Sequence, residues 1–340
     1  MLYYYALLYY NINLKQINTM KKIHLISTLI GLLAFSTISK ADLKVVTSIK
    51  PIHSLASYIM DGVGSPGLIV DGYNSPHNFQ LKPSHAKMLE QADIIFWVGE
   101  DLENFLEKPL DTIAKKAEKI ELLEIKGIKK LKFRERNIFE EHDDHGHDAK
   151  KEEHDDHGHD AKKEEHDNHE GHGHGEYDPH IWLDPINAKV ILNEITEHLI
   201  ENDSKNASTY KSNLAKALAK IDKLIIDVIT ETNTDLSYVV FHDAYQYYEN
   251  RFNVNILGAM TVNPDVMPGA EQIHEIHEII EHDNVSCILS EPQFNPDIIK
   301  SIAKDTSVKT GVLDPLGANL KPGKDLYFDL IRNMSASFNC

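Results

Sequence analysis

Four side chains outside the most histidine-rich part of the sequence have the chemistry to bind one metal ion together. His77 lies in "SPHNFQLKPSH" and His180 in "YDPHIWLDP", whereas His242 ends the apolar run "VVFH" and Asp314 follows the apolar run "GVL". Imidazole nitrogen and carboxylate oxygen both bind Zn²⁺ at about 2.0–2.2 Å in tetrahedral sites. These residue types allow a zinc site, but their scattered positions equally allow four ordinary loop or strand-end residues.

A block of histidine and acidic residues precedes His180. The phrase "EEHDDHGHDAKK" occupies residues 140–151, recurs at 152–163, and is followed by a decayed third copy. Because the block has almost no apolar residues, it cannot offset the entropy cost of ordering, and we expect a disordered insertion at about 140–176. The histidines of this block are His142, His145, His147, His154, His157, His159, His166, His169, His172 and His174.

The block offers mixed imidazole and carboxylate ligands on a flexible chain. Such a segment forms many weak, interconverting metal sites, since the chain must be ordered around each bound ion. We therefore expect auxiliary weak metal binding, which would catch zinc and pass it to a rigid site or sense its excess. The alternative is repeat expansion in a tolerant loop, with incidental metal binding.

The elements that must position these side chains follow an α/β pattern. Short apolar runs begin at Leu43, Ala92, Ser237, Val285 and Val308, and helix-like sequence separates them. This alternation is typical of buried parallel strands with covering helices. In open α/β sheets, ligands bind beyond the carboxyl ends of the strands. Each of the four candidate ligands directly follows an apolar run or lies in a connecting loop.

One long amphipathic segment breaks the alternation. Across residues 206–233 the apolar side chains recur at spacings of three and four, which predicts one helix about 40 Å long. A helix of this length can cross two lobes. We therefore expect two lobes, each with a mainly parallel sheet and flanking helices, joined by this spanning helix. The predicted ranges are 42–205 for the N-terminal lobe and 234–340 for the C-terminal lobe.

The first residues carry the pattern of an export signal. Lys21 and Lys22 follow Met20, an apolar stretch runs to Phe35, and small residues precede a predicted cleavage site after Ala41. The apolar stretch is shorter than the roughly 20 residues that a membrane span needs. We expect residues 1–41 to comprise an N-terminal extension and a signal peptide, with Met20 as the natural start, and the mature protein to be periplasmic.

Charge and cysteine content narrow the class of protein further. The chain of 340 residues has a net charge of −18, but residues 140–178 alone account for −12. The remaining charge of about −6 argues against a nucleic-acid partner. The two cysteines suggest a disulfide if the protein is exported, and two unrelated thiols if it is cytosolic.

Six stretches of the sequence resemble the solute-binding proteins of zinc ABC transporters, the ZnuA type of the metal-binding cluster A-I. They run in the family's order from about Val45 to Cys340 and read "SPHNFQLKPSHAKMLEQADIIFWVGEDLE", "HIWLDP", "FHDAYQYYE", "TVNPDVMPGAEQIHEI", "SEPQFNPDII" and "LDPLGANLKPG". A histidine- and acid-rich insertion is also typical of the zinc members. The resemblance implies a carrier, not an enzyme, that captures Zn²⁺ as its transported ligand and delivers it to an ABC permease with a cytoplasmic ATPase.

The resemblance assigns the metal ligands residue by residue. The histidine of the family's P-H-x-(F/Y) loop matches His77, that of H-x-W-L-x-P matches His180, and that of F-H-D-A-Y matches His242. The aspartate of L-D-P-L-G, a ligand in some members, matches Asp314. Some zinc members have a ligating glutamate where this chain has Pro76, so the fourth ligand is either Asp314 or a water.

The resemblance also bears on the choice of metal and on the cysteines. Manganese members usually have Glu at the position of His242, and carboxylate-rich sites suit harder ions, so the histidine favours zinc. The family's disulfide maps onto Cys287 and Cys340. We expect a monomer. The alternatives are a manganese- or iron-binding member of the group, or a secreted zinc hydrolase with an open metal position beside a general base.

Overall fold

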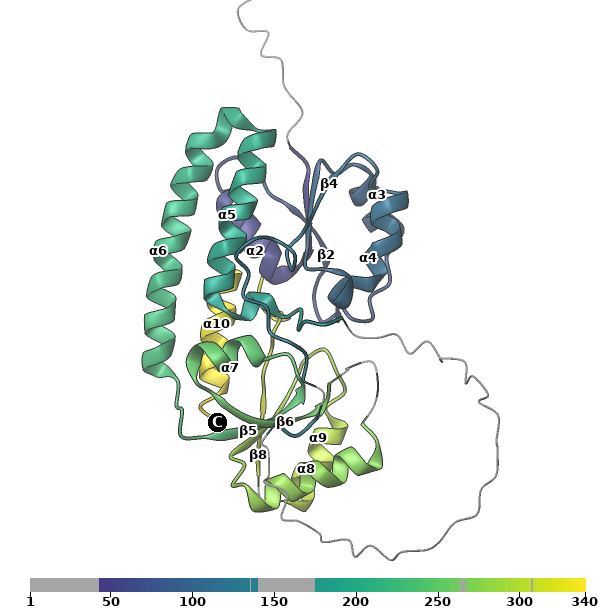
Figure 1. Ribbon diagram of the computed structural model, residues 1–340, viewed down its shortest axis with the longest axis vertical. Coiled ribbons are helices and arrows are strands. Elements are labelled where there is room, and N and C mark those ends of the chain that lie inside the picture. Colours follow the sequence, from purple (N-terminus) through teal and green to yellow (C-terminus); the bar gives the residue numbers. More distant parts are fainter. Residues whose placement is uncertain are drawn as a thin grey trace, which may run out of the picture. The chain divides into compact units, whose positions relative to one another are not determined.

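The computed structural model describes residues 43–340 except residue 135, the block at 140–174, and residues 263, 265, 267 and 307. The predicted signal peptide, its cleavage site and all ten block histidines lie outside the described residues. Within these limits the chain forms α/β structure throughout, as the alternation of apolar runs and helical segments predicts (Figure 1).

The first sheet is fully parallel, with the strand order β2-β1-β3-β4. Every residue of β1 is buried in its β-branched run "VVTSI", which suits a central strand covered on both faces. The strands are β1 (Val45–Ile49), β2 (Gly67–Val70), β3 (Ile94–Trp97) and β4 (Glu118–Glu121). The helices of this part are α2 (Lys50–Ile59), α3 (Pro83–Glu90), α4 (Glu100–Thr112) and α5 (Pro185–Asn202), with a 3₁₀ turn η1 (Ile181–Leu183).

The second sheet repeats this topology, with the parallel order β6-β5-β7-β8. Its strands are β5 (Ser237–His242), β6 (Asn255–Thr261), β7 (Cys287–Ser290) and β8 (Lys309–Val312), and its helices are α7 (Gln246–Phe252), α8 (Ala270–His282) and α9 (Asp297–Asp305). In each sheet the first strand lies between the second and the third, so β1 is flanked by β2 and β3, and β5 by β6 and β7. The chain therefore winds in opposite directions on the two sides of the first strand. Such a switch point opens a crevice at the carboxyl ends of the strands. The prediction of two mainly parallel sheets is confirmed.

A long helix spans the two sheets. Helix α6 (Ala207–Glu231) has 25 residues, follows the 3₁₀ turn η2 (Ser204–Asn206), and buries one stripe of its surface. It packs against α2 and α5 and against the C-terminal helix α10 (Leu326–Ser337) (Figure 1). The predicted spanning helix is confirmed, with ends within two residues of the prediction. No described helix is long and apolar enough to cross a membrane.

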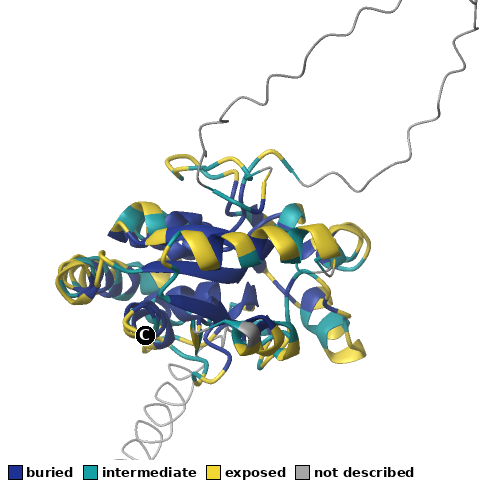
Figure 2. Cartoon of the chain, turned by 90° about the horizontal axis from the view of Figure 1, so that it is seen from below, coloured by how far each residue is buried: buried dark blue, intermediate teal, exposed yellow. Residues whose placement is uncertain are grey.

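Buried polar contacts join the first sheet to the chain that follows the second. The Lys50 ammonium group, 3% exposed, donates hydrogen bonds to the carbonyl oxygens of Gly317 and Leu320 at 2.6 and 2.7 Å. The indole of Trp182 donates to the carbonyl of Pro315 at 2.8 Å. Figure 2 shows the buried strands in the interior and exposed residues on the outer faces of the helices. The two lobes therefore share one packed interior rather than a flexible hinge.

The chain on either side of the histidine block is attached to different lobes. Before the block, the Phe139 amide donates to the carbonyl of Leu257 on β6 at 2.8 Å, and Ile138 forms an antiparallel bridge with Gly258. After the block, the Gly175 amide donates to the Asp101 carboxylate on α4 at 2.9 Å. The described chain therefore lies on the second lobe just before the block and on the first lobe just after it.

A disulfide joins Cys287, at the start of β7, to Cys340 after α10, as the family resemblance implies. Cys287 is fully buried, and the sequence separation is 53 residues. Constraining a loop of this length in the unfolded chain contributes about 4 kcal/mol in the chain-entropy model. The bridge fixes the C-terminus of α10 to the core of the second sheet.

We predict that Cys340→Ala lowers the free energy of unfolding by about 2–4 kcal/mol. Cys340 is exposed, so the substitution removes the bridge without leaving a cavity in the core. Urea denaturation with and without a thiol reductant measures the effect. The reductant should destabilise the wild type by a similar amount and leave the variant unchanged, whereas equal stabilities of both proteins under oxidising conditions would contradict a stabilising bridge.

Candidate metal centre

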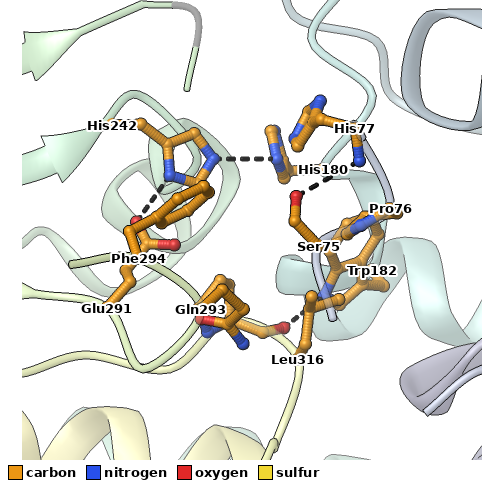
Figure 3. Close-up of a pocket in the computed structure, with 11 residues that line it drawn as sticks. Ser75, Pro76, His77, His180, Trp182, His242, Glu291, Gln293, Phe294 and Leu316 are labelled. Carbon is orange, nitrogen blue, oxygen red and sulfur yellow. Dashed lines mark hydrogen bonds and ion pairs between the residues drawn. The ribbon is translucent and has the colours of Figure 1, made fainter. Parts of the chain in front are cut away.

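His77 lies in the loop between β2 and α3. Its backbone amide donates to the Ser75 hydroxyl at 3.2 Å, and the preceding Pro76 is buried. This local turn aims the imidazole into a small pocket that His180, Trp182 and Glu291 also line (Figure 3). The ring is half-buried, so His77 forms the outer side of the site.

His180 is fixed by a carboxylate two residues before it. The Asp178 Oδ1 atom accepts hydrogen bonds from both the backbone amide of His180, at 2.9 Å, and its ring Nδ1, at 2.7 Å. Asp178 is itself held by Leu131 and Tyr247 through its backbone amide and carbonyl. Because Nδ1 donates to the carboxylate, the Nε2 atom keeps its lone pair.

Local helix signals place His180 as firmly as Asp178 does. The sequence "HIWLDP" makes the short 3₁₀ turn η1 directly after His180, and Asp184 caps α5 by accepting from the Ile186 amide at 2.8 Å. Pro185 opens that helix, where its missing N–H costs nothing. Trp182 is fully buried, so it serves packing, as expected of an aromatic residue beside the site.

His242 is the last residue of β5. Its Nδ1 atom lies 2.5 Å from Oε1 of Glu291, which directly follows the neighbouring strand β7. Both side chains are buried. Parallel neighbours end at the same edge of a sheet, which is why two residues 49 apart in the chain meet here. His242 therefore presents Nε2 away from its own sheet.

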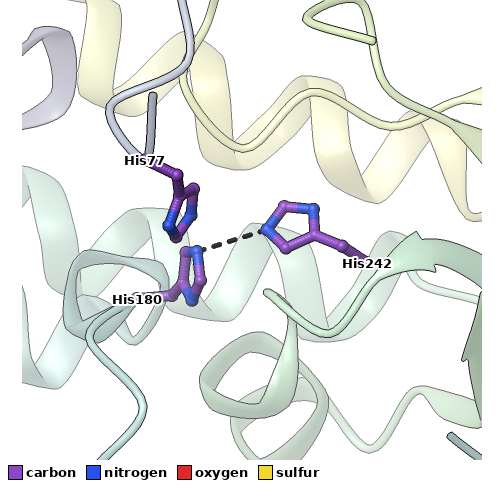
Figure 4. A group of neighbouring side chains, drawn as sticks. All are labelled: His77, His180 and His242. Atoms are coloured by element: carbon purple, nitrogen blue, oxygen red, sulfur yellow. Dashed lines mark hydrogen bonds between the residues drawn. The ribbon is translucent and has the colours of Figure 1, made fainter. Parts of the chain in front are cut away.

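The three imidazoles converge on one point. A ligand nitrogen from each of His77, His180 and His242 lies within 4.8 Å of the others, and the Nε2 atoms of His180 and His242 are 3.4 Å apart (Figure 4). Two nitrogens bound at about 2.0–2.1 Å to a tetrahedral ion are about 3.4 Å apart. A cation between the two Nε2 atoms would be bound by both rings, with each Nδ1 donating to its carboxylate.

Burial sets the electrostatics of the site. Desolvation raises the pKa of Asp178 to about 7. The pKa of His180 lies well below its usual value, first because of burial and then because of the nearby His242 charge. Burial also acts to lower the pKa of His242, but the carboxylates of Glu291, Asp243 and Asp178 outweigh it and raise that pKa. The site therefore favours a neutral His180, and a bound cation would replace the proton that the carboxylates favour on His242.

The structure does not bring Asp314 into this group. Its Oδ1 atom accepts hydrogen bonds from the amides of Leu316 and Gly317 and from the Gln293 side chain, at 2.9–3.0 Å. Its Oδ2 atom accepts from the Ala318 amide at 2.6 Å. In this arrangement the carboxylate closes the turn after β8, next to the pocket wall formed by Pro315 and Leu316.

Sequence reasoning missed the two carboxylates that orient the ligands. Asp178 stands in "YDPH" two residues before a candidate ligand, a spacing that permits a hydrogen bond to the same residue's amide and ring. Glu291 directly follows the predicted strand that ends in "CILS", next to the strand of His242. The position of Glu291 at the end of a predicted strand could have marked it as a residue near the site. Its pairing with His242 could not be predicted without knowing that their two strands are neighbours in the sheet.

Comparison with known proteins identifies relatives over most of the chain. The family model described as "Zinc-uptake complex component A periplasmic" (ZnuA) matches residues 45–339. The high-affinity zinc uptake system protein ZnuA of Brucella abortus is 48% identical over 300 residues, which cover 86% of this chain and 90% of that protein.

Solved structures share the fold at lower identity. A crystal structure of ZnuA superposes with a TM-score of 0.67 at 20% identity, covering 88% of this chain and 100% of that chain. The solute-binding protein FpvC of Pseudomonas aeruginosa, in complex with Mn²⁺, superposes with a TM-score of 0.69 at 17% identity, covering 88% and 98%. The fold alone therefore does not choose between metals.

The family match does settle the class of protein. It extends over nearly all described residues, and its members are transport components rather than enzymes, which sets aside the hydrolase alternative. The chain belongs to the ZnuA family of periplasmic zinc-uptake components.

Proposed function

We propose that the protein captures Zn²⁺ in the periplasm at His77, His180 and His242 and delivers it to the membrane permease of an ABC transporter that a cytoplasmic ATPase drives. The observation that carries this proposal is the 3.4 Å separation of two Nε2 atoms whose Nδ1 partners are buried carboxylates. A carboxylate that accepts from Nδ1 fixes the tautomer and raises the basicity of a ligating histidine. Zinc is the cargo of this site and not a catalytic cofactor.

The ligand set supports zinc over manganese or iron. Three imidazoles suit zinc, whereas manganese prefers sites rich in carboxylate and water oxygen. The two nearby carboxylates, Asp178 and Glu291, are engaged with ring nitrogens and act on the ligands rather than on the ion. The same donors would hold a manganese ion less tightly.

We infer that a water, not Asp314, completes the tetrahedron. Asp314 accepts four hydrogen bonds where it lies, three of them from backbone amides that follow it in the chain. Swinging the carboxylate to the ion would break these bonds and reopen the turn that carries Pro315 to Trp182. Pro76 replaces the other carboxylate ligand known in the family, which leaves this position to solvent.

Release of the ion is best served by the His77 loop. His180 and His242 are buried and bonded to buried carboxylates, whereas His77 is half-buried on a loop between two elements. Helix α6 and the Lys50 contacts to residues 317–320 limit wide lobe opening. A modest shift of this loop would remove one ligand and leave the rest of the site in place.

The remaining parts of the chain fit the same function. We propose that residues 1–41 contain the export signal, with cleavage after Ala41, and that the mature protein acts as a monomer. The oxidised pair Cys287 and Cys340 suits the periplasm. The histidine block would act as an auxiliary, weaker store of zinc next to the rigid site.

We predict that replacing His77, His180 and His242 together by Ala abolishes tight zinc binding. The effect should exceed the about 10–100-fold loss typical of changes beside a metal ligand. Competition with a high-affinity chelator measures the tight site without interference from weak block sites. The matched control is His274→Ala, since His274 is an exposed helix residue outside the group. If the triple variant still bound zinc tightly, the assignment of these three histidines as the zinc ligands would be wrong.

We predict opposite outcomes for Glu291→Gln and Asp314→Asn. The first removes the anionic partner of His242 and should lower zinc affinity about 10–100-fold. The second weakens a turn and should cost stability but change zinc affinity by less than about tenfold, because the carboxylate is not a ligand in our assignment. Chelator competition and thermal unfolding separate the two effects. A loss of affinity in Asp314→Asn beyond that of Glu291→Gln would make Asp314 the fourth ligand.

We predict that deleting residues 140–174 leaves the tight site intact and lowers the total amount of zinc bound. Because Phe139 and Gly175 are attached to different lobes, a Gly/Ser linker should replace the block. Unperturbed imidazoles have a pKa of about 6.5, so the extra binding should fade as the pH falls below about 6. Calorimetric titration at two pH values tests this.

A full-length variant with the ten block histidines changed to Asn is the matched control for that deletion. It should behave like the deletion, since it removes ligands and keeps the chain length. If either variant loses the tight site, a block histidine is a primary ligand, and the role of His180 has to be reassigned.

A further inference from the structure

We propose that Glu118, His198 and Glu201 form a second, weaker divalent-cation site on the N-terminal lobe. Glu118 is the first residue of β4, and His198 and Glu201 lie in the last turn of α5. Since the sheet is parallel, Glu118 stands at its amino edge, whereas His77 belongs to a loop that leaves its carboxyl edge. The proposed site is therefore at the opposite end of the sheet from the three-histidine centre.

The three side chains offer one ligand atom each within 4.8 Å of one another. Across the described ranges only this set and the three-histidine centre bring three such residues together. The spacing of His198 and Glu201 is i, i+3, which places both side chains on one face of the helix. The edge strand β4 supplies the third side chain. Two rigid elements therefore carry this constellation rather than one loop.

His198 repeats the orientation device of the main centre. Its Nε2 atom is 3.2 Å from Oε1 of Glu194, one turn earlier on α5, so this carboxylate can accept the ring N–H. The other ring nitrogen, Nδ1, faces Glu118. The ring also packs edge-on against Phe96, with centroids 6.1 Å apart. The imidazole is therefore held with Nδ1 towards the other two ligands.

The contact between His198 and Glu118 brings two possible ligand atoms together. Nδ1 is buried and lies 2.9 Å from Oε1 of Glu118, within ion-pair distance, and it makes no hydrogen bond in this arrangement. Two ligands of one tetrahedral ion lie about 3.3 Å apart, so a small separation of the two side chains admits an ion between them.

Asn202 orients the carboxylate of Glu118. Its amide donates to Oε2 of Glu118 and to the carbonyl of His198, both at 3.0 Å, which leaves Oε1 of Glu118 turned to the imidazole. The imidazole is surrounded by the carboxylates of Glu118, Glu194 and Glu201. One imidazole with carboxylate oxygens suits Zn²⁺ and also harder divalent ions such as Mn²⁺. The exposed Glu201 makes the site weaker than the buried centre.

The direct test is anomalous diffraction at the zinc edge from crystals of the full chain equilibrated with zinc chloride. We expect a peak at about 2.0–2.2 Å from His198 Nδ1 and from a carboxylate oxygen, in addition to the peak at the main centre. A peak at the main centre with none beside His198, at zinc concentrations that saturate weak sites, would overturn the proposal without touching the proposed function. The same measurement on crystals equilibrated with manganese chloride, at the manganese edge, shows whether the site also binds Mn²⁺.

A solution experiment removes any effect of crystal packing. Carbethoxylation by diethyl pyrocarbonate, read peptide by peptide, reports each histidine separately in the full chain. When free zinc is about five times the dissociation constant, the modification rate of His198 should fall about sixfold, since the free fraction falls as 1/(1 + [Zn]/Kd). His274, an exposed imidazole 3.4 Å from Glu278, is the matched control without a third ligand and should keep its rate.

The double variant Glu118→Gln with Glu201→Gln completes the test. It keeps side-chain size and should abolish zinc protection of His198 while leaving protection of His180 and His242 unchanged. Circular dichroism checks that the double variant is folded. If it is unfolded, the single variant Glu201→Gln replaces it, because Glu201 is exposed and its substitution does not disturb the core. Protection of His198 that persists in the folded variant, or that is equal at His274, would contradict a site built from these residues.

Discussion

The buried hydrogen bond between a carboxylate and the Nδ1 atom of a histidine is the interaction on which this site depends. It occurs at Asp178 with His180 and at Glu291 with His242, and it turns both Nε2 atoms towards the same point. Each pair alone would be an ordinary buried polar contact. The two pairs form a candidate metal centre only because one belongs to the chain that enters the first lobe's helix α5 and the other to the end of strand β5. The fold's task is to bring these two rigid pairs face to face.

That task explains why the lobes are locked rather than hinged. A separation of 3.4 Å between two ligand atoms tolerates little error, because a shift of about 1 Å would spoil tetrahedral coordination. Helix α6 packs on elements from both ends of the chain, and Lys50 and Trp182 bond to the turn at 315–320 from across the interface. A buried ammonium group depends on its carbonyl acceptors, so separating them while the charge stays out of water is costly. Rigidity here supports the site, and movement is left to the half-buried His77 loop.

The sequence predicted what local patterns determine. Alternating apolar runs and one long amphipathic segment were enough for two parallel sheets and a spanning helix, and strand ends marked His242. The partners of the ligands were not predictable in the same way, because Glu291 and His242 are 49 residues apart and meet only through strand order. The role of Asp314 was also open in the sequence, since the same residue can bind a metal or close a turn. The spacing of His198 and Glu201 puts them on one helix face, but nothing in the sequence places Glu118 beside them. The domain boundaries, unlike the elements, remain a prediction.

The position of the histidine block in the chain gives its proposed role a physical basis. His174 is six residues before His180, so a zinc ion bound near the end of the block lies within about 20 Å of the centre along the chain. A donor tethered at this distance acts at a high effective concentration, which speeds transfer without any new contact. Transfer in the right direction requires that the donor bind more weakly than the acceptor. The two classes of site differ in this sense, because a rigid centre has its ligands oriented in advance by Asp178 and Glu291, whereas a chain of low apolar content must be ordered around each ion. Under the proposed function, this contrast in pre-organisation would direct zinc from the repeats to the three histidines.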